Sequence, residues 1–289
     1  MYRKMNDLLR LANNQGTPLW VPVVKNECQL SSMTEEEVFV KMERRYEIMR
    51  RSATRALTKG LATAGGLIEG MAEQHQAYSV KEQSLSGEFI NRVMARALSA
   101  SEVNASMGKI CAAPTAGACG VLPAVLMSVE ERLGLSRRTV LEGLITASGV
   151  GAVIMLNATV SGAEGGCQAE CGAAAAMAAA AAVQMAGGSN QAALNAVSIA
   201  LMNCMGLVCD PVAGLVQIPC AQRNASQAVN AVISAELALG GMACVIPADE
   251  AIEAMYRVGK MLPNQLKETA QGGVAVTPSG KAVYNKVFG

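Results

Sequence analysis

Two thiols and two carboxylates lie together in the segment EGGCQAECG, residues 164–172. Cys167 and Cys171 are four residues apart, with Glu164 before them and Glu170 between them. On a helix, this spacing places both thiols on one face. Thiolates bind soft metals, and nearby carboxylates orient ligands or carry protons. The segment therefore indicates metal or thiol chemistry, although a single buried cysteine is more often a small apolar side chain.

Two other segments have similar local chemistry. They are MGKICAAPTAGACG, residues 107–120, and MGLVCDPVAGLVQIPCAQRN, residues 205–224. Each sets cysteine beside glycine or proline, which let the backbone approach a bulky group closely and stiffen the chain around it. No Cys-x2-Cys pair occurs among the nine cysteines, which argues against a zinc finger or ribbon.

The segments AEGGCQAECG, GLVCDPVAGLVQIPCAQRNA and GKICAAPTAGACGVLPA together resemble the signature segments of the iron–sulfur-dependent L-serine dehydratases, also called L-serine ammonia-lyases. The chain is similar to their α chain, which corresponds to the C-terminal catalytic domain of the single-chain forms. The resemblance implies a [4Fe-4S] cluster and no pyridoxal phosphate. It implies Cys167, Cys209 and Cys220 as the cluster ligands, with Cys171 packing beside them and binding no iron.

Three cysteine ligands leave one iron of such a cluster without a protein side chain. An iron of this kind acts as a Lewis acid, in the same way as the open position of a catalytic metal site. The resemblance implies that it assists departure of the hydroxyl of L-serine, so that loss of water and hydrolysis give pyruvate and ammonia. No cysteine lies near Gly289, so we expect water or substrate at the open iron.

The resemblance also indicates residues on the substrate side. Pro114, Thr115 and Gly117 are expected to form a turn whose N–H groups face the substrate carboxylate or the cluster, although an ordinary turn before a helix gives the same pattern. Ala116 stands where the family often has Asn, which weakens any side-chain role there. Lys109, just before this turn, is one candidate catalytic residue.

Arg223 is the other candidate catalytic residue, in a region with few charges. Its guanidinium could bind a substrate carboxylate or form an ion pair with Glu164, Glu170 or Asp210, and the ion pair is favoured. His75, the only histidine, lies in a polar stretch and is expected at a solvated helix end. The general base stays unidentified.

A second subunit is implied by the resemblance. In the family a Ser-His-Thr motif belongs to the β chain or to the N-terminal domain, and this chain has no such segment. We therefore expect L-serine as substrate and a serine dehydratase β chain as partner, in a heterodimer or larger assembly. A related L-cysteine desulfidase and a non-catalytic, metal-stabilised helical interaction module are the alternatives.

The overall composition argues against other partners. The chain has a net charge of +1 and only 3% aromatic residues. A chain with this composition has no excess of positive charge to bind nucleic acid or acidic lipid. It also has too few aromatic side chains for the bases of single-stranded nucleic acid to stack on. The segment MYRKMNDLLRLANNQG has no features of a signal peptide, and nine is an odd number of cysteines. We therefore expect free thiols and a cytoplasmic protein.

Long uncharged stretches raise the alternative of membrane spans. No charged residue occurs between Glu142 and Glu164 or between Glu170 and Asp210. Residues 173–183, however, are mostly alanine, which is only weakly apolar, and polar residues and glycines follow. A membrane-spanning helix needs about 20 predominantly apolar residues. We expect buried helices of a globular protein and no contact with a membrane.

The pattern of the whole chain predicts an all-α fold. Alternating strand runs are not evident, and the abundant alanine, leucine and methionine suit closely packed helices. Residues 143–248 contain only five charged side chains, which indicates an interior shielded from water. We expect one compact helical domain over residues 1–270, with Ala- and Gly-rich central helices and a cluster held by loops. Residues 1–60 would form its more charged N-terminal part, and 271–289 a C-terminal tail.

Capping residues predict where several helices begin. Thr34 and Glu37 have the spacing of a capping box, in which each side chain bonds to the backbone N–H of the other residue. Ser136, with Thr139 three residues later, predicts the start of another helix. Ser79, with Glu82 three residues later, predicts a further start.

Overall fold

A computed structural model of the chain describes residues 2–81 and 83–289. Within these ranges the chain forms thirteen α-helices and no β-strand, which confirms the all-α prediction. The helices are α1 (Met5–Asn14), α2 (Trp20–Ser31), α3 (Glu35–Arg55), α4 (Met71–Ser79), α5 (Gly87–Ala105), α6 (Val121–Leu133), α7 (Arg137–Asn157), α8 (Gly162–Gly165), α9 (Ala173–Met185), α10 (Asn190–Met202), α11 (Cys220–Leu239), α12 (Ala248–Met261) and α13 (Pro278–Phe288).

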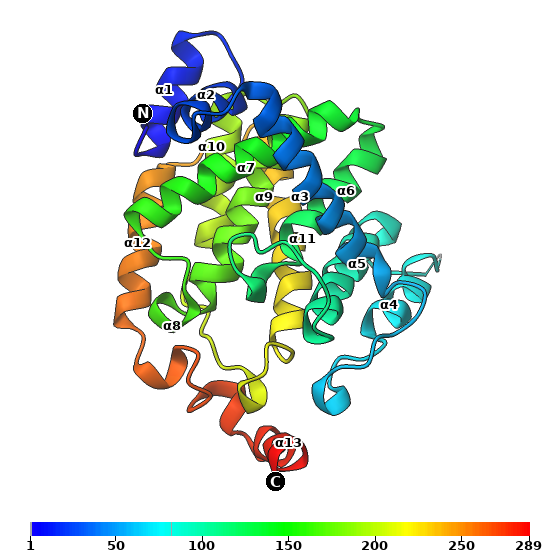
Figure 1. The fold of residues 1–289 in the computed structure, drawn as a ribbon. Coiled ribbons are helices and arrows are strands. Elements are labelled where there is room, and N and C mark those ends of the chain that lie inside the picture. The colour runs from blue at the N-terminus through cyan, green and yellow to red at the C-terminus, as the bar shows by residue number, and fades with distance from the viewer. Residues whose placement is uncertain (1, 82) are drawn as a thin grey trace.

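Helix α9 lies at the centre of the bundle, with α6, α7, α10 and α11 packed around it (Figure 1). It is built almost entirely of alanine, and every face of it is buried. Side chains this small let neighbouring helices approach closely. Glycine extends the effect on α7, since a Cβ at Gly143 would lie 2.6 Å from Cγ of Met185. The Ala- and Gly-rich segments therefore form the core, as the sequence predicts.

Two of the predicted helix starts are confirmed. Thr34 caps α3, with its hydroxyl accepting the N–H of Glu37 at 3.3 Å while the Glu37 carboxylate accepts the N–H of Thr34 at 2.8 Å. Ser136 caps α7 by accepting the N–H of Thr139 at 3.2 Å. The start predicted at Ser79 is wrong, because Ser79 is the last residue of α4. Glu82, the other residue of that pattern, lies outside the described residues.

The charged N-terminal part packs on the same core as the rest. Helices α1 and α2 lie against α10 and α7, and α3 lies against α5 and α6. The backbone N–H groups of Met5 and Asn6 donate to the carboxylate of Asp249, at 2.7 and 3.0 Å, which joins the start of α1 to the start of α12. A carboxylate is stabilised at a helix N-terminus by the free N–H groups there.

The C-terminal residues are more ordered than a loose tail. A 3-10 turn, η6 (Gly273–Val276), precedes α13, and α13 lies at the end of the molecule opposite α1 (Figure 1). The hydroxyl of Thr277 caps α13 by accepting the N–H of Gly280 at 3.1 Å. The division of the chain near residue 270 stays a prediction.

Helix α7 alone, within the described residues, is long and apolar enough to cross a membrane by length and composition. Of its most apolar window, 67% is buried inside the protein. Much of that burial is against α9 and α2. A core helix of a globular protein meets the same length and composition criteria, so this feature is weak evidence for a membrane span.

The packing around α9 generates a prediction about stability. Ala178 is fully buried, so Ala178→Leu should lower the free energy of unfolding by about 1–3 kcal/mol through overpacking. Ala152, on the exposed face of α7, is the matched control, and Ala152→Leu should change it by less than about 0.5 kcal/mol. Denaturant unfolding measures both. Equal effects of the two substitutions would contradict a tightly packed centre at α9.

Candidate active site

Cys167 lies where a short helix meets a π-helix. Helix α8 ends at Gly165, Gly166 takes a positive φ of 75°, which favours glycine, and the π-helix η3 (Gln168–Gly172) then leads into α9. The sequence predicts that loops hold the cluster, whereas this segment is largely helical. Its irregular turn still brings the two thiols close enough for Cys171 to lower the pKa of Cys167. Such π turns recur at functional sites in proteins.

Cys209 and Cys220 come from a second segment. The N–H of Cys209 donates to the carbonyl of Leu266 at 2.9 Å, and its carbonyl accepts the N–H of Glu268 at 2.8 Å. This isolated bridge is a short strand-like pairing that ties Cys209 to a segment far along the chain. Cys220 is the first residue of α11 and follows Pro219. Cys209 is buried and Cys220 half-buried.

These segments bring four thiols into one region of the protein. Of the four, the thiol of Cys167 ionises most readily. A hydrogen bond from the Cys171 thiol lowers the pKa of Cys167, and the charge of Arg223 lowers it further, against the effect of burial. Burial raises the pKa of Cys220 to about 12, and the negative charge of Cys167 adds to this. Burial and the same charge also raise the pKa of Cys209. The charge of Cys167 thus reaches both Cys209 and Cys220, and the thiol of Cys209 lies 3.9 Å from Oε2 of Glu170, the residue before Cys171.

The turn expected on the substrate side packs against this group. It contains the 3-10 helix η2 (Ala116–Ala118), and the hydroxyl of Thr115 donates to Oε1 of Glu170 at 2.7 Å. A Cβ at Gly117 would lie 3.0 Å from the same carboxylate oxygen, so a larger residue there would press on Glu170. The half-buried Pro114 precedes Thr115. Thr115 and Gly117 thus face Glu170, whereas Pro114 lines a cavity beside α2, α3 and α7.

A second set of ligand atoms adjoins the thiols. One carboxylate oxygen each from Glu170 and Glu268 and the sulfur of Cys209 all lie within 4.8 Å of one another. Glu170 is buried, and burial raises the pKa of its carboxyl, with the charge of Glu268 adding to the shift and the bond from Thr115 opposing it. Oxygen and sulfur ligands at this spacing could hold a metal ion. Glu268 was missed from the sequence because nothing in its segment signals chemistry.

Arg223 forms the ion pair that the sequence favoured, with Asp210 as its partner. Its Nη1 lies 2.7 Å from Oδ1 of Asp210 and donates to the carbonyl of Val208 at 2.7 Å. The other oxygen of Asp210 accepts the N–H of Val274 at 2.7 Å. The pair therefore joins the residue after Cys209 to both α11 and the C-terminal segment. Glu164, another possible partner, is exposed on α8.

The other two candidates lie apart from the thiols. Lys109 is exposed, and within the described residues its side chain makes no hydrogen bond or ion pair with the cysteine segments. His75 lies half-buried in the middle of α4 and not at a solvated helix end as predicted, and α4 packs on α5 at the edge of the bundle farthest from α8 (Figure 1). Burial lowers the pKa of His75, and its ring lies 5.9 Å from that of Tyr78. Neither residue adjoins the thiols.

The residues present fit a thiolate-bound metal group. Two separate segments supply buried or half-buried sulfur atoms, and a guanidinium lies beside them to offset negative charge. The backbone also comes close to sulfur here, because a Cβ at Gly172 would overlap the thiol of Cys204. Thiolate ligands with a close-fitting backbone are typical of soft-metal and iron–sulfur sites.

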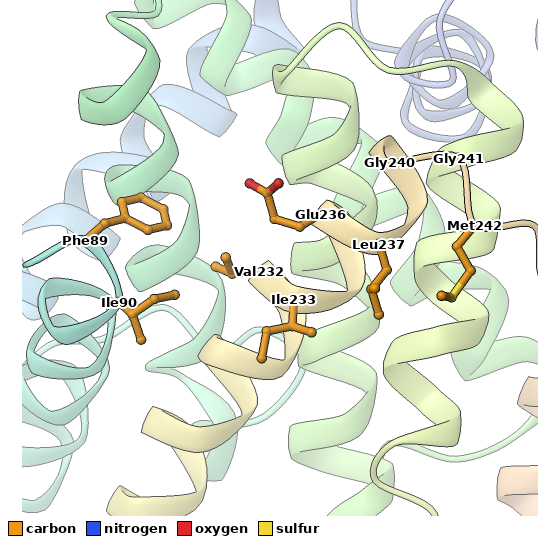
Figure 2. Close-up of a pocket in the computed structure, with 9 residues that line it drawn as sticks. All are labelled: Phe89, Ile90, Val232, Ile233, Glu236, Leu237, Gly240, Gly241 and Met242. Carbon is orange, nitrogen blue, oxygen red and sulfur yellow. The ribbon is translucent and has the colours of Figure 1, made fainter. Parts of the chain in front are cut away.

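An apolar groove on the surface lies away from this chemistry. Figure 2 shows Phe89 and Ile90 of α5 opposite Ile233 and Leu237 of α11, with Glu236 as its charged residue. Glu236 is sixteen residues beyond Cys220 on the same helix, which is about 24 Å at 1.5 Å per residue. The groove carries no thiol and is not the candidate active site.

Comparison with known proteins identifies the family. Residues 14–275 match the sequence profile of the serine dehydratase alpha chain. The chain is 45% identical to the L-serine dehydratase, alpha chain, of Peptoniphilus asaccharolyticus over 98% of this chain and 97% of that protein. It is 43% identical to a probable L-serine dehydratase, alpha chain, of Bacillus subtilis over 100% and 96%. With L-serine dehydratase TdcG of Escherichia coli the identity is 35%, over 95% of this chain but 62% of the relative. The chain belongs to the serine dehydratase alpha chain family.

Proposed function

We propose that this chain is the catalytic α subunit of an L-serine ammonia-lyase, which converts L-serine to pyruvate and ammonia. The observation that carries the proposal is the buried Glu170 carboxylate, which accepts from the Thr115 hydroxyl of the turn at 2.7 Å and lies 3.9 Å from the thiol of Cys209. The names of its relatives as L-serine dehydratases support the reaction. We further propose that these three cysteines hold a [4Fe-4S] cluster.

The side chains of this site have distinct tasks in the proposed reaction. A [4Fe-4S] cluster with three protein ligands supplies a Lewis acid for departure of the serine hydroxyl. Cys171, whose pKa is raised, keeps its proton and lowers the pKa of Cys167. Thr115 holds the Glu170 carboxylate at the substrate turn, and the Arg223–Asp210 pair fixes the backbone around Cys209. The buried surroundings limit access of water and strengthen each of these interactions.

A separate β chain is part of the proposal. The relatives that this chain matches over nearly their whole length are named alpha chains, whereas it covers only 62% of TdcG. Longer relatives therefore carry in one chain a part that this chain does not match. We propose that a β chain supplies that part and completes the substrate site in a heterodimer or larger assembly in the cytoplasm.

A single metal ion is the second candidate for the site. Glu170, Cys209 and Glu268 offer two carboxylates and one thiol within 4.8 Å. Such a set suits a divalent ion such as iron or zinc. It uses only one of the three converging cysteines, and Glu268 is exposed, so we favour the cluster.

The α chain purified without oxygen and combined with its β chain should form pyruvate from L-serine. Cys167→Ser, Cys209→Ser and Cys220→Ser should each remove both iron and activity, because each removes a thiolate ligand. Cys171→Ala is the matched control and should keep the iron. Metal and sulfide analysis alongside pyruvate formation checks this.

Three results would contradict parts of this proposal. Pyruvate formed from L-cysteine but not from L-serine would indicate a desulfidase. One metal ion per chain without sulfide would favour the site at Glu170, Cys209 and Glu268. Loss of iron from Cys171→Ala, with Cys209→Ser unaffected, would show that the ligand set is wrong.

The bond between Thr115 and Glu170 gives a separate prediction. Thr115→Val keeps the shape of the side chain but removes the hydroxyl that donates to the buried carboxylate at 2.7 Å. We expect kcat/KM for L-serine to fall about 10-fold, equivalent to about 1.4 kcal/mol. Thr115→Ser retains the hydroxyl and should stay close to the unaltered enzyme. If the Val and Ser variants have the same kinetics, the hydroxyl has no role in the reaction.

A further inference from the structure

One buried amide joins the substrate turn to the helix that begins at Cys220. The side chain of Asn224, on α11, is 1% exposed. Its Nδ2 donates to the carbonyl of Gly117 at 2.6 Å and to the carbonyl of Cys220 at 2.9 Å. Its Oδ1 accepts the N–H of Gly120 at 2.8 Å. Both amide hydrogens and the oxygen are therefore used, and two of the three bonds go to the turn.

Few other side chains hold the turn through hydrogen bonds that are as short and as buried. The carbonyl of Gly117 also lies 3.9 Å from the thiol of Cys171, a weak contact. Asn104 donates to the carbonyl of Ala116 at 3.2 Å, but this bond is exposed to water. The bond from Thr115 holds the turn on its Glu170 side only. Asn224 is thus the buried group that fixes the turn relative to α11.

The position of Gly120 shows how closely the three elements meet. A Cβ at Gly120 would lie 2.5 Å from the carbonyl oxygen of Ala97 on α5 and 3.0 Å from Oδ1 of Asn224. The backbone of the turn is therefore pressed between α5 and α11, where a small rotation would break the bonds to Asn224. A buried backbone group that loses its partner costs about 1–3 kcal/mol.

We propose that Asn224 is a positioning residue of the reaction, which holds the Gly117 turn in register with the first turn of α11. This inference rests on the proposed function, in which the turn binds substrate and Cys220 binds the cluster. Within the described residues, the backbone N–H groups of Ala116 and Gly117 donate no hydrogen bond. Asn224 keeps this turn at a constant place relative to Glu170 and to Cys220.

The test compares Asn224 with a second asparagine on the same helix. Asn230 also bonds through its side chain, to the carbonyl of Ala200 at 3.0 Å and to Asn203 at 2.8 Å, but these bonds join α11 to α10. Asn224→Ala and Asn230→Ala should both lower stability. We expect only Asn224→Ala to lower kcat/KM for L-serine, by about 10- to 100-fold with a raised KM, at unchanged iron content.

Asn224→Asp distinguishes the hydrogen bonds that the side chain donates from the one that it accepts. The carboxylate keeps the side-chain volume and still accepts from Gly120, but it cannot donate to Gly117 or Cys220. It should lose kcat/KM as Asn224→Ala does, and it replaces that variant if Asn224→Ala does not fold. The assay uses the α chain with its β chain under anaerobic conditions. A second readout is the serine concentration that changes absorbance near 400 nm, which should rise in both variants.

The outcomes separate this inference from the proposed function. An active, iron-containing enzyme whose Asn224 variants match Asn230→Ala in kinetics would overturn the role of Asn224 alone. If both Asn224 variants lose iron, Asn224 supports the cluster and not the substrate turn, and the inference is wrong. If the unaltered complex makes no pyruvate from L-serine, the proposed function fails and takes this inference with it.

Discussion

A thiolate in an apolar interior needs polar groups and positive charge around it, and Cys167 has both. The neighbouring Cys171 thiol lowers the pKa of Cys167, and the guanidinium of Arg223 lowers it further. Arg223 is itself held by Asp210 at 2.7 Å. Removing one partner of a buried pair leaves an uncompensated charge and costs about 3–5 kcal/mol. This constraint explains why distant segments meet here in a region with so few other charges.

Small residues make this arrangement possible. The alanines of α9 let four helices close around it, so the π-helix that precedes α9 is firmly supported. Gly117 and Gly162 leave room for the Glu170 carboxylate, since a Cβ at either position would lie 3.0 or 2.5 Å from one of its oxygens. The many alanines and glycines, which are only weakly apolar, thus allow polar groups to pack tightly against sulfur.

Much of this could be predicted from local sequence, because capping and composition act locally. The Thr34 capping box and the alanine core follow from neighbouring residues, and three ordered motifs indicated the family. The places of Glu268 and Asn224 could not be predicted, since each depends on contact with residues far away in the chain. The helix start predicted at Ser79 is wrong because its hydroxyl donates to the carbonyl of Gln76 within α4 and caps no new helix.

The central claim is that three cysteines hold an iron–sulfur cluster with one iron left for substrate. Mössbauer spectroscopy of the anaerobic αβ complex, with and without L-serine, tests it most directly. The account predicts four iron sites, of which one changes its signal when serine is added while the other three stay the same. Absence of iron, or four sites that all stay unchanged through turnover, would contradict it.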